Sequence, residues 1–245
     1  ADRPQHGRFQ EFTQCDVDAI GSDSLLLELE YIQMVDAIFE DLKLSGCTLR
    51  INHRKVLEAI ARLANAGTET TRFFTILDKL DKVGWEEVKR LFIDEEYNID
   101  IIDSIQNVLA DKTTADQLDA LKKLIGGSTD VEGPLQDLGL LFSNLEQLNT
   151  TKVMFDWTLA RGLNYYTGTI FEISAPEQVS VGSIGAGGRY DNLTEVFGMK
   201  DMSGIGISFG LDRIELVLSE LDLYPSSLYT SVDVLVVNFS MELMT

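Results

Sequence analysis

The chain has 245 residues, of which 44% are hydrophobic and 24% charged, a composition typical of a folded protein with one or two domains. Forty acidic residues against 20 basic ones give a formal net charge of -20, which argues against a broad, non-specific grip on nucleic acid phosphates. Local clusters of Lys and Arg could still hold phosphates. No apolar run approaches the roughly 18 residues of a membrane span. Cys15 and Cys47 form neither a disulfide framework nor a zinc set, so we expect a cytoplasmic protein with no protein-bound metal.

The first half of the chain predicts two strands, one long helix and then a series of short helices. Polar and apolar residues alternate roughly over 9–20, which indicates a strand, and near-helical spacing over 23–43 indicates a helix. A short strand follows at 47–52. Short amphipathic stretches punctuated by glycines then succeed one another, which predicts an all-helical insertion domain.

The second half returns to a period of two from residue 151. Further strand-like runs occupy 168–174, 178–185 and 205–211, and helical spacing covers 212–223. These elements predict an α+β fold, in which an antiparallel sheet with helices on one face is interrupted by the insertion. We therefore expect four parts: the first part of the core at 1–53, the insertion at 54–131, the second part of the core at 132–223, and 224–245 as a linker and the start of a further domain.

Both ends of the chain suggest that neighbouring segments are missing. The sequence begins without Met, and an apolar, strand-like stretch starts near Val232. An unpaired apolar strand at a chain end is an aggregation hazard, so we expect it to begin a truncated domain. The alternative is that this strand pairs into the main sheet.

The segment R-G-L-N-Y-Y-T-G at 161–168 suits an anionic, ring-containing ligand. A guanidinium such as that of Arg161 can hold a carboxylate and a phosphate at any working pH. Tyr165 and Tyr166 offer a flat wall and two hydroxyls. Taken alone, the segment could also be a turn with a surface arginine and two core tyrosines.

Two further segments have the small residues or the charge that a ligand site needs. The run G-A-G-G-R-Y-D at 185–191 has small residues that would let a ligand approach the backbone closely. The other interpretation is that its glycines form a tight bend and that Arg189 is exposed to solvent. The run 204–213 predicts a strand entering a helix, with Arg213 in the first helical turn. A cation is slightly unfavourable there, which suggests an anionic partner or an ion pair with Asp212.

The opening segment combines a basic loop with a row of hydrogen-bond acceptors. Arg3 and Arg8 stand out in a very acidic chain, and Gln14, Asp16 and Asp18 share one face of the following strand. Inward-facing acceptors need donors, which a ligand amine or imidazole could supply. The other interpretation is that this face is simply exposed to solvent.

Together these four segments resemble the histidyl-tRNA synthetase family, which belongs to the class II aminoacyl-tRNA synthetases. Residues 161–168 resemble the signature R-G-L-D-Y-Y, and 186–191 resemble A-G-G-R-Y-D. Residues 210–213 are similar to class II motif 3, and residues 2–18 to motif 2. The stretch 77–88 resembles the helical insertion of the eukaryotic-type branch.

The resemblance implies that histidine and ATP form histidyl-adenylate and that histidine then passes to the acceptor end of tRNA(His). It implies a homodimer, Mg²⁺ with the triphosphate, and no membrane. Arg161 matches the catalytic arginine that bridges the histidine carboxylate and the α-phosphate. The positions that match the family's histidine contacts are Gln14, Asp18, Arg161, Tyr165 and Tyr166. The positions that match its ATP contacts are Asp2 and Phe12 on adenine, Arg3 and Arg8 on the phosphates, and Arg213 on the γ-phosphate.

The chain also departs from the family pattern. Asn164 stands where the family usually has Asp, Asn192 where Gly is common, and Asp212 where Glu is frequent. Motif 1, the first arginine of motif 2 and the anticodon-binding domain are absent, so we expect this chain to be an incomplete enzyme. The alternatives are a non-catalytic relative, either the regulatory subunit of ATP phosphoribosyltransferase or the pseudo-synthetase domain of a stress kinase, and a coincidental likeness. The retained Arg213 favours the synthetase.

Overall fold

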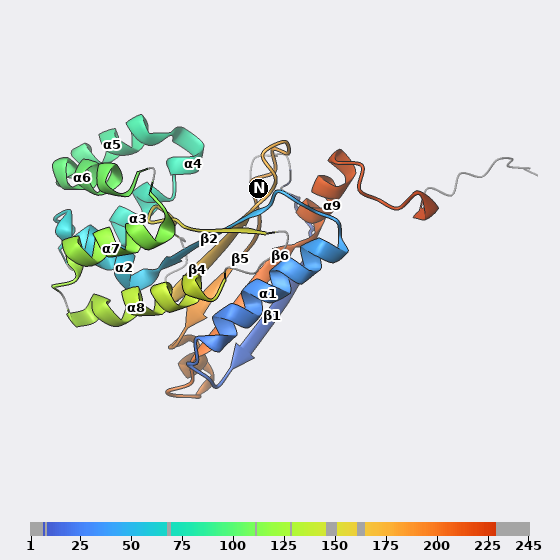
Figure 1. The fold of residues 1–245 in the computed structure, drawn as a ribbon, viewed down its shortest axis with the longest axis horizontal. Coiled ribbons are helices and arrows are strands. Elements are labelled where there is room, and N and C mark those ends of the chain that lie inside the picture. The colour runs from blue at the N-terminus through green and yellow to red at the C-terminus, as the bar shows by residue number, and fades with distance from the viewer. Residues whose placement is uncertain are drawn as a thin grey trace, which may run out of the picture.

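The computed structural model describes residues 7, 9–67, 70–110, 112–127, 129–145, 151–160 and 165–228. Within these residues one six-stranded sheet has the strand order β1-β6-β5-β4-β2-β3 (Figure 1). Neighbouring strands are antiparallel except β2 and β3, which run parallel. The predicted α+β fold is confirmed, and the parallel pair is an addition to it. The strands are β1 (Gln14–Ile20), β2 (Thr48–His53), β3 (Lys152–Phe155), β4 (Thr169–Ser174), β5 (Ser183–Tyr190) and β6 (Gly204–Gly210).

The register divides the sheet into an apolar and a polar face. Asp18 lies opposite Gly206, which in turn lies opposite Gly188, so even-numbered residues of β1, β5 and β6 point to one side. Odd-numbered residues of the same strands point to the other side, where Ile207 and Phe209 of β6 are buried. Burial of this apolar face supplies the main stabilisation of the sheet.

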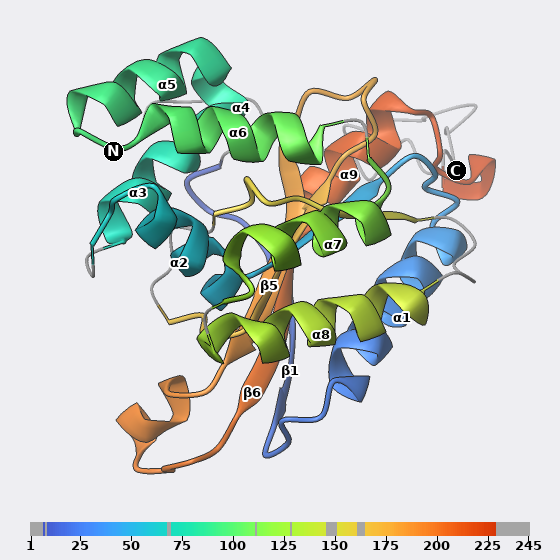
Figure 2. The same cartoon turned by 60° about the vertical axis from the view of Figure 1, so that its left-hand side comes forward.

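Helices cover the apolar face. Helix α1 (Leu26–Asp41) and helix α8 (Thr129–Ser143) lie across it, as Figures 1 and 2 show. Helix α9 (Leu211–Glu220) follows β6 directly and contributes Ile214 and Val217 to the same buried cluster as Phe209. In α1 the buried apolar residues recur every three or four positions, as an amphipathic helix requires. They are Tyr31, Ile32, Val35 and Phe39.

A run of helices separates β2 from its parallel neighbour β3. This run contains a ring cluster in which Phe73 lies 4.7 Å from Phe92 and 5.4 Å from Tyr97, measured between ring centroids, and Phe73 and Phe92 belong to the same hydrophobic cluster as the buried residues of the sheet. Helix α8 crosses the boundary that we expected between residues 131 and 132. The other helices of the run are α2 (Arg54–Leu63), α3 (Thr71–Leu77), α4 (Leu80–Val83), α5 (Trp85–Asp94), α6 (Ile99–Leu109) and α7 (Thr114–Ile125).

The junction between β2 and α2 contains a buried histidine. Nδ1 of His53 accepts a hydrogen bond from the Lys55 amide at 3.2 Å and so caps α2. Burial, with a smaller contribution from the charge of Lys55, lowers the pKa of His53 to about 4. The imidazole is therefore neutral at physiological pH.

Three predicted strands differ in extent from those observed. The first begins at Gln14 rather than at residue 9, and the alternation over 151–160 forms a strand only at Lys152–Phe155. There the Asp156 carboxylate accepts hydrogen bonds from the amide and hydroxyl of Thr158, which turns the chain out of the sheet. The run predicted at 178–185 is shifted to Ser183–Tyr190, after a turn at Gly182 with φ of 72°. The strand-like tail from Val232 lies outside the described residues, and two short 3-10 helices, η1 (Leu193–Phe197) and η2 (Ser226–Leu228), complete the described elements.

Candidate active site

The polar face of the sheet has a floor of very small residues. A Cβ added at Gly206 would lie 2.0 Å from Oδ1 of Asp18, and one added at Gly204 would lie 2.3 Å from the ring of Tyr190. Neither distance is compatible with a real side chain. The glycines therefore allow the polar side chains of neighbouring strands to lie flat across the sheet.

Asp18 and Tyr190 form a hydrogen-bonded pair on this floor. The Tyr190 hydroxyl donates to Oδ1 of Asp18 at 2.7 Å. Burial, and then the hydrogen bond and charge of Asp18, raise the pKa of Tyr190, so the phenol keeps its proton as a donor. The tyrosine thus fixes the direction of a carboxylate that is itself solvent-exposed.

Tyr165 and Tyr166 lie beside this pair. Their ring centroids are 4.5 Å apart and their hydroxyl oxygens 3.5 Å apart. Tyr166 is buried, whereas 39% of Tyr165 is exposed and its ring meets that of Tyr190 edge-on at 6.4 Å. Three tyrosines and one carboxylate therefore lie together, and these side-chain types suit the binding of a flat ring with an N–H donor.

Gln14 lies on the same face of β1 as Asp18, at the beginning of the strand. Its Nε2 donates to Oγ of Ser208 at 2.6 Å. Gln14 and Asp18 are four residues apart on one strand, hence about 13 Å apart along it. This span accommodates one amino acid with a hydrogen bond at each end.

The start of α9 is tied to the segment that precedes β1. Nε of Arg213 donates to the Gly7 carbonyl at 2.8 Å, and its Nη1 donates to the Ser183 carbonyl. The Asp212 carboxylate accepts from the Thr13 amide at 2.6 Å, next to Phe12, whose side chain is exposed. Residues from the two ends of the described chain thus meet at one end of the site.

Hydrogen bonds join the tyrosine segment, 165–168, to the end of the glycine-rich segment, 185–191. The Thr167 hydroxyl donates to Oδ2 of Asp191 at 2.5 Å, and the Asp191 amide donates back to that hydroxyl at 3.0 Å. Because Thr167 directly follows Tyr166, this link holds the tyrosine segment against the end of β5.

Arg189 is a structural residue rather than the exposed arginine of our alternative interpretation. Its Nε and Nη2 each donate to the carboxylate of Glu28 at 2.5 Å, and it also bonds the carbonyls of Ser22 and Ser24. Both side chains of this ion pair are buried. Arg189 therefore attaches the start of α1 to the sheet and is not available to a ligand.

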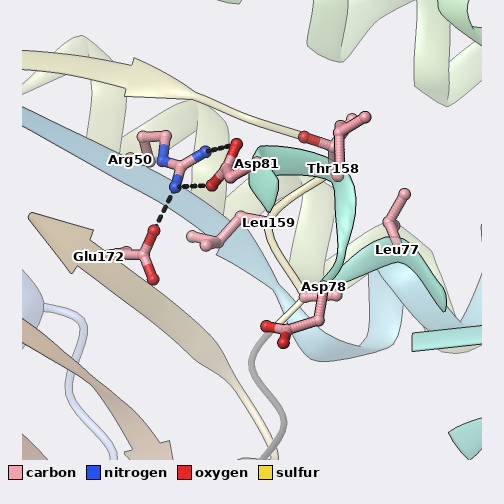
Figure 3. Close-up of a pocket in the computed structure, with 9 residues that line it drawn as sticks. Arg50, Leu77, Asp78, Asp81, Thr158, Leu159 and Glu172 are labelled. Atoms are coloured by element: carbon pink, nitrogen blue, oxygen red, sulfur yellow. Dashed lines mark hydrogen bonds and ion pairs between the residues drawn. The ribbon is translucent and has the colours of Figure 1, made fainter. Parts of the chain in front are cut away.

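A cluster around Arg50 was missed by sequence reasoning. Its guanidinium, on the polar side of β2, bonds the carboxylates of Asp81 and Glu172 in a hollow (Figure 3). It also bonds the carboxylate of Asp156. The only sequence signal was the placement of Thr48, Arg50 and Asn52 at period two, which puts a charged residue on one face of a strand.

Several predicted site residues lie outside the described part of the chain. These are Asp2, Arg3, Arg8 and Arg161, and Asn164 is also outside it. Among the residues that the structure describes, no group of three or more His, Cys, Asp or Glu side chains could hold a metal ion. No helix in the described ranges is both long and apolar enough to cross a membrane.

Comparison with known sequences decides the family. A sequence model of the family described as histidyl-tRNA synthetase matches residues 1–214. The chain belongs to the histidyl-tRNA synthetase family. It is 48% identical to a histidine–tRNA ligase from Christiangramia forsetii over 98% of this chain and 53% of that protein. A histidine–tRNA ligase from Flavobacterium johnsoniae is 46% identical over 98% of this chain and 51% of that protein.

Solved structures agree with this assignment. The histidyl-tRNA synthetase from Nostoc sp. PCC 7120 has a TM-score of 0.77 at 30% identity, covering 87% of this chain and 52% of that one. A protein from Bacillus halodurans C described as an ATP phosphoribosyltransferase regulatory subunit/histidyl-tRNA synthetase shares the fold, with a TM-score of 0.69 at 23% identity over 86% of this chain and 53% of that one. The chain spans about half the length of the relatives that it matches.

Proposed function

We propose that the whole protein is a histidine–tRNA ligase, which activates histidine with ATP and transfers it to tRNA(His). The observation that carries this proposal is the group of Asp18, Tyr190, Tyr165 and Tyr166 over a glycine floor, in a member of the histidyl-tRNA synthetase family. Such a group is built for a flat, hydrogen-bonding ring, and imidazole is such a ring.

The proposed histidine subsite runs from Asp18 to Gln14. The Asp18 carboxylate accepts from an imidazole N–H and favours the protonated ring, which distinguishes histidine from apolar amino acids of similar size. Tyr165 and Tyr166 provide the ring wall, and Gln14 lies at the distance expected for the backbone end of the substrate.

The reaction itself is a displacement at phosphorus. An oxygen of the histidine carboxylate bonds to the α-phosphorus of ATP, the bond from that phosphorus to the bridging oxygen breaks, and pyrophosphate leaves with the electron pair. Catalysis then depends on positioning and on stabilising negative charge. We assign this role to Arg161, whose guanidinium can bridge the carboxylate and the α-phosphate.

The proposed ATP subsite lies at the start of α9, which contains Arg213 and is tied through Asp212 to Thr13, next to Phe12 in the chain. Arg213 already holds two backbone carbonyls there, so its guanidinium is oriented before any phosphate arrives. ATP would enter as its magnesium complex, since phosphate oxygens are ligands that Mg²⁺ prefers. The residues assigned to this subsite are Asp2 and Phe12 for adenine, and Arg3, Arg8 and Arg213 for the phosphates.

The remaining parts of the proposal concern the assembled enzyme. We propose a cytoplasmic homodimer whose helical insertion, of the kind found in the eukaryotic-type branch, contacts the acceptor arm of tRNA(His). The stretch 77–88 supports the comparison with that branch, although the relatives named above are bacterial.

Histidine-dependent exchange of pyrophosphate into ATP tests the proposal. We expect exchange in the full-length protein and its loss in Arg161→Ala, because removing a group that stabilises the transition state costs on the order of 3 kcal/mol or more. Circular dichroism of the variant checks that the fold is retained. An exchange rate like that of the wild type in Arg161→Ala would remove Arg161 from the mechanism.

The same assay distinguishes a ligase from a non-catalytic regulatory subunit, which is the main alternative. For such a regulatory subunit, we expect histidine binding without formation of an adenylate. Histidine binding by the full-length protein in calorimetry, with no exchange at any ATP concentration, would favour that alternative over the ligase.

A further inference from the structure

The turn that follows β3 supports one of the tyrosines of the candidate site. Leu159, Tyr166 and Ile170 form a small buried cluster that is separate from the main core. Ile170 lies opposite Gly188 in the register, so this cluster lies on the polar face of the sheet. A Cβ added at Gly188 would lie 2.9 Å from Cδ1 of Tyr166, so the Tyr166 ring lies directly on the sheet. The position of Leu159 therefore limits where this ring can lie.

Hydrogen bonds from β2 and within the turn hold Leu159 in place. Its amide donates to the Asp156 carbonyl at 3.0 Å, and its carbonyl accepts from Nδ2 of Asn52 at 3.0 Å. The Asp156 amide donates to the Ile51 carbonyl at 2.9 Å. Oδ1 of Asp156 also accepts from the Thr158 amide at 2.9 Å. The turn is therefore attached to β2 at both of its ends.

Arg50 connects this turn to the helical insertion. Its Nη1 lies 3.2 Å from Oδ2 of Asp156. Its Nη2 lies 2.7 Å from Oδ2 of Asp81 in α4 and also bonds Glu172 of β4, and Leu159 lines the same hollow (Figure 3). The Arg50 side chain is 17% exposed, whereas that of Asp81 is 64% exposed. One largely buried side chain thus joins an exposed carboxylate of the insertion to the turn that contains Leu159.

The geometry requires an arginine at position 50. A guanidinium presents five N–H donors in one plane and can serve three carboxylates at once, whereas an ammonium is a single point charge. Burial alone would lower the pKa of Arg50, but the hydrogen bond of Asp81 and the charges of all three partners outweigh that effect and raise it. The cation is permanent, so it can hold Asp156 in place at any working pH.

We propose that Arg50 is a positioning residue for the Tyr166 ring, acting through the turn that contains Leu159, and that Asp81 couples the helical insertion to this turn. The inference rests on the proposed function, because it assigns Tyr166 to the wall against which the imidazole of histidine binds. A shift of Leu159 then changes the affinity for histidine and leaves the ATP contacts unchanged. The placement of the insertion thus affects the histidine subsite, although none of the residues assigned to that subsite belongs to the insertion.

Calorimetric titration of full-length variants with histidine and with ATP tests this role. We expect Arg50→Lys to weaken histidine binding about 5-fold and Asp81→Asn about 3-fold, with ATP binding within 2-fold of wild type. The control is Glu95→Gln, which breaks the exposed Arg72–Glu95 pair within the insertion and should leave both affinities unchanged. Wild-type histidine affinity in Arg50→Lys, an equal loss for ATP, or an equal loss in Glu95→Gln would overturn the proposal.

A double-mutant cycle tests whether Arg50 acts through the tyrosine. In a Tyr166→Ala background the ring that Arg50 positions is gone, so Arg50→Lys should cause no further loss of histidine affinity. A role in general stability would instead give the same loss in both backgrounds. A 5-fold loss on adding Arg50→Lys to Tyr166→Ala would therefore overturn the proposed route.

A further test depends on neither ligand. The amides of Thr158 and Leu159 both donate to Asp156, so native-state hydrogen exchange at these two amides reports how firmly the turn is held. We expect several-fold faster exchange in Arg50→Lys and Asp81→Asn than in wild type and Glu95→Gln. Equal exchange in all four proteins would overturn the positioning role. If the wild type does not bind histidine, the proposed function fails, while the exchange rates still decide whether Arg50 holds the turn.

Discussion

On the helix-covered face of the sheet the inward side chains are branched or aromatic, such as Ile207 and Phe209, whereas on the opposite face the same strand presents Gly206 and Ser208. On the first face these side chains are buried. The second is nearly flat and carries Asp18 and Tyr190 as its polar groups. Adjacent residues of one strand therefore serve different purposes, and substitutions at neighbouring positions should affect stability or ligand binding separately.

The largest expected effect comes from neighbouring residues of β6. Ile207→Ala should lower the free energy of unfolding by about 2–4 kcal/mol, because it removes a buried side chain and leaves a cavity. Ser208→Ala should change it by less than about 1 kcal/mol, because only the exposed hydrogen bond to Gln14 is lost. Urea unfolding of the full-length variants measures both. Equal losses would show that the two faces contribute to stability alike.

A smaller effect is expected for the charge on the polar face. Asp18→Asn should weaken histidine binding by about 2 kcal/mol, near 30-fold, because a hydrogen bond to a charged group is lost. The KM for ATP should stay within 2-fold. Asp16→Asn, an exposed acid on the same side of β1, is the matched control. Parallel losses for histidine and ATP would argue against the assignment of Asp18 to the imidazole.

The covered face also contains a titratable group, His53. Its pKa of about 4 in the folded protein lies below its ordinary value of about 6.5, so the unfolded state takes up the proton first as the pH falls. Stability from this group is complete above pH 6.5 and is lost toward pH 4, with a loss of about 2 kcal/mol between pH 7.5 and pH 5. His53→Asn keeps a capping side chain and should flatten this part of the pH profile. The same slope in both proteins would contradict the buried, neutral histidine.

The smallest expected effect is that of one hydroxyl. Tyr190→Phe removes the donor to Asp18 and should raise the KM for histidine about 5- to 10-fold, near 1 kcal/mol. The urea midpoint should change little. A large fall in stability without a change in KM would place Tyr190 among the structural residues of the covered face.

The sequence predicted the α+β class because the periodicity changes clearly from helical to period two, and because β4 and β6 alternate well. It could not predict the parallel pairing of β2 with β3, since no local pattern specifies which strands become neighbours. The end of β3 depends on one side chain, Asp156, whose turn interrupts an alternation that continues in the sequence.

The sequence predicted those candidate site residues that belong to one of the family's sequence motifs. Asp18, Tyr165 and Tyr166 come together in the structure. Tyr190 stood in a signature too, but its role depends on the register that brings its hydroxyl to Asp18 across β6. Arg50 was missed because all three of its partners are distant in sequence.

The pairing of β1 with β6 has a consequence for synthesis. Gln14 and Ser208 meet across 194 residues, so β1 leaves the ribosome long before its partner exists. At about 5–20 residues per second, that wait lasts roughly 10–40 s. During this time the apolar side of β1 has no sheet to join, whereas the helices between β2 and β3 can form from local contacts. Pairing of β1 with β6 should therefore be a late step in folding, after the helices between β2 and β3 have formed.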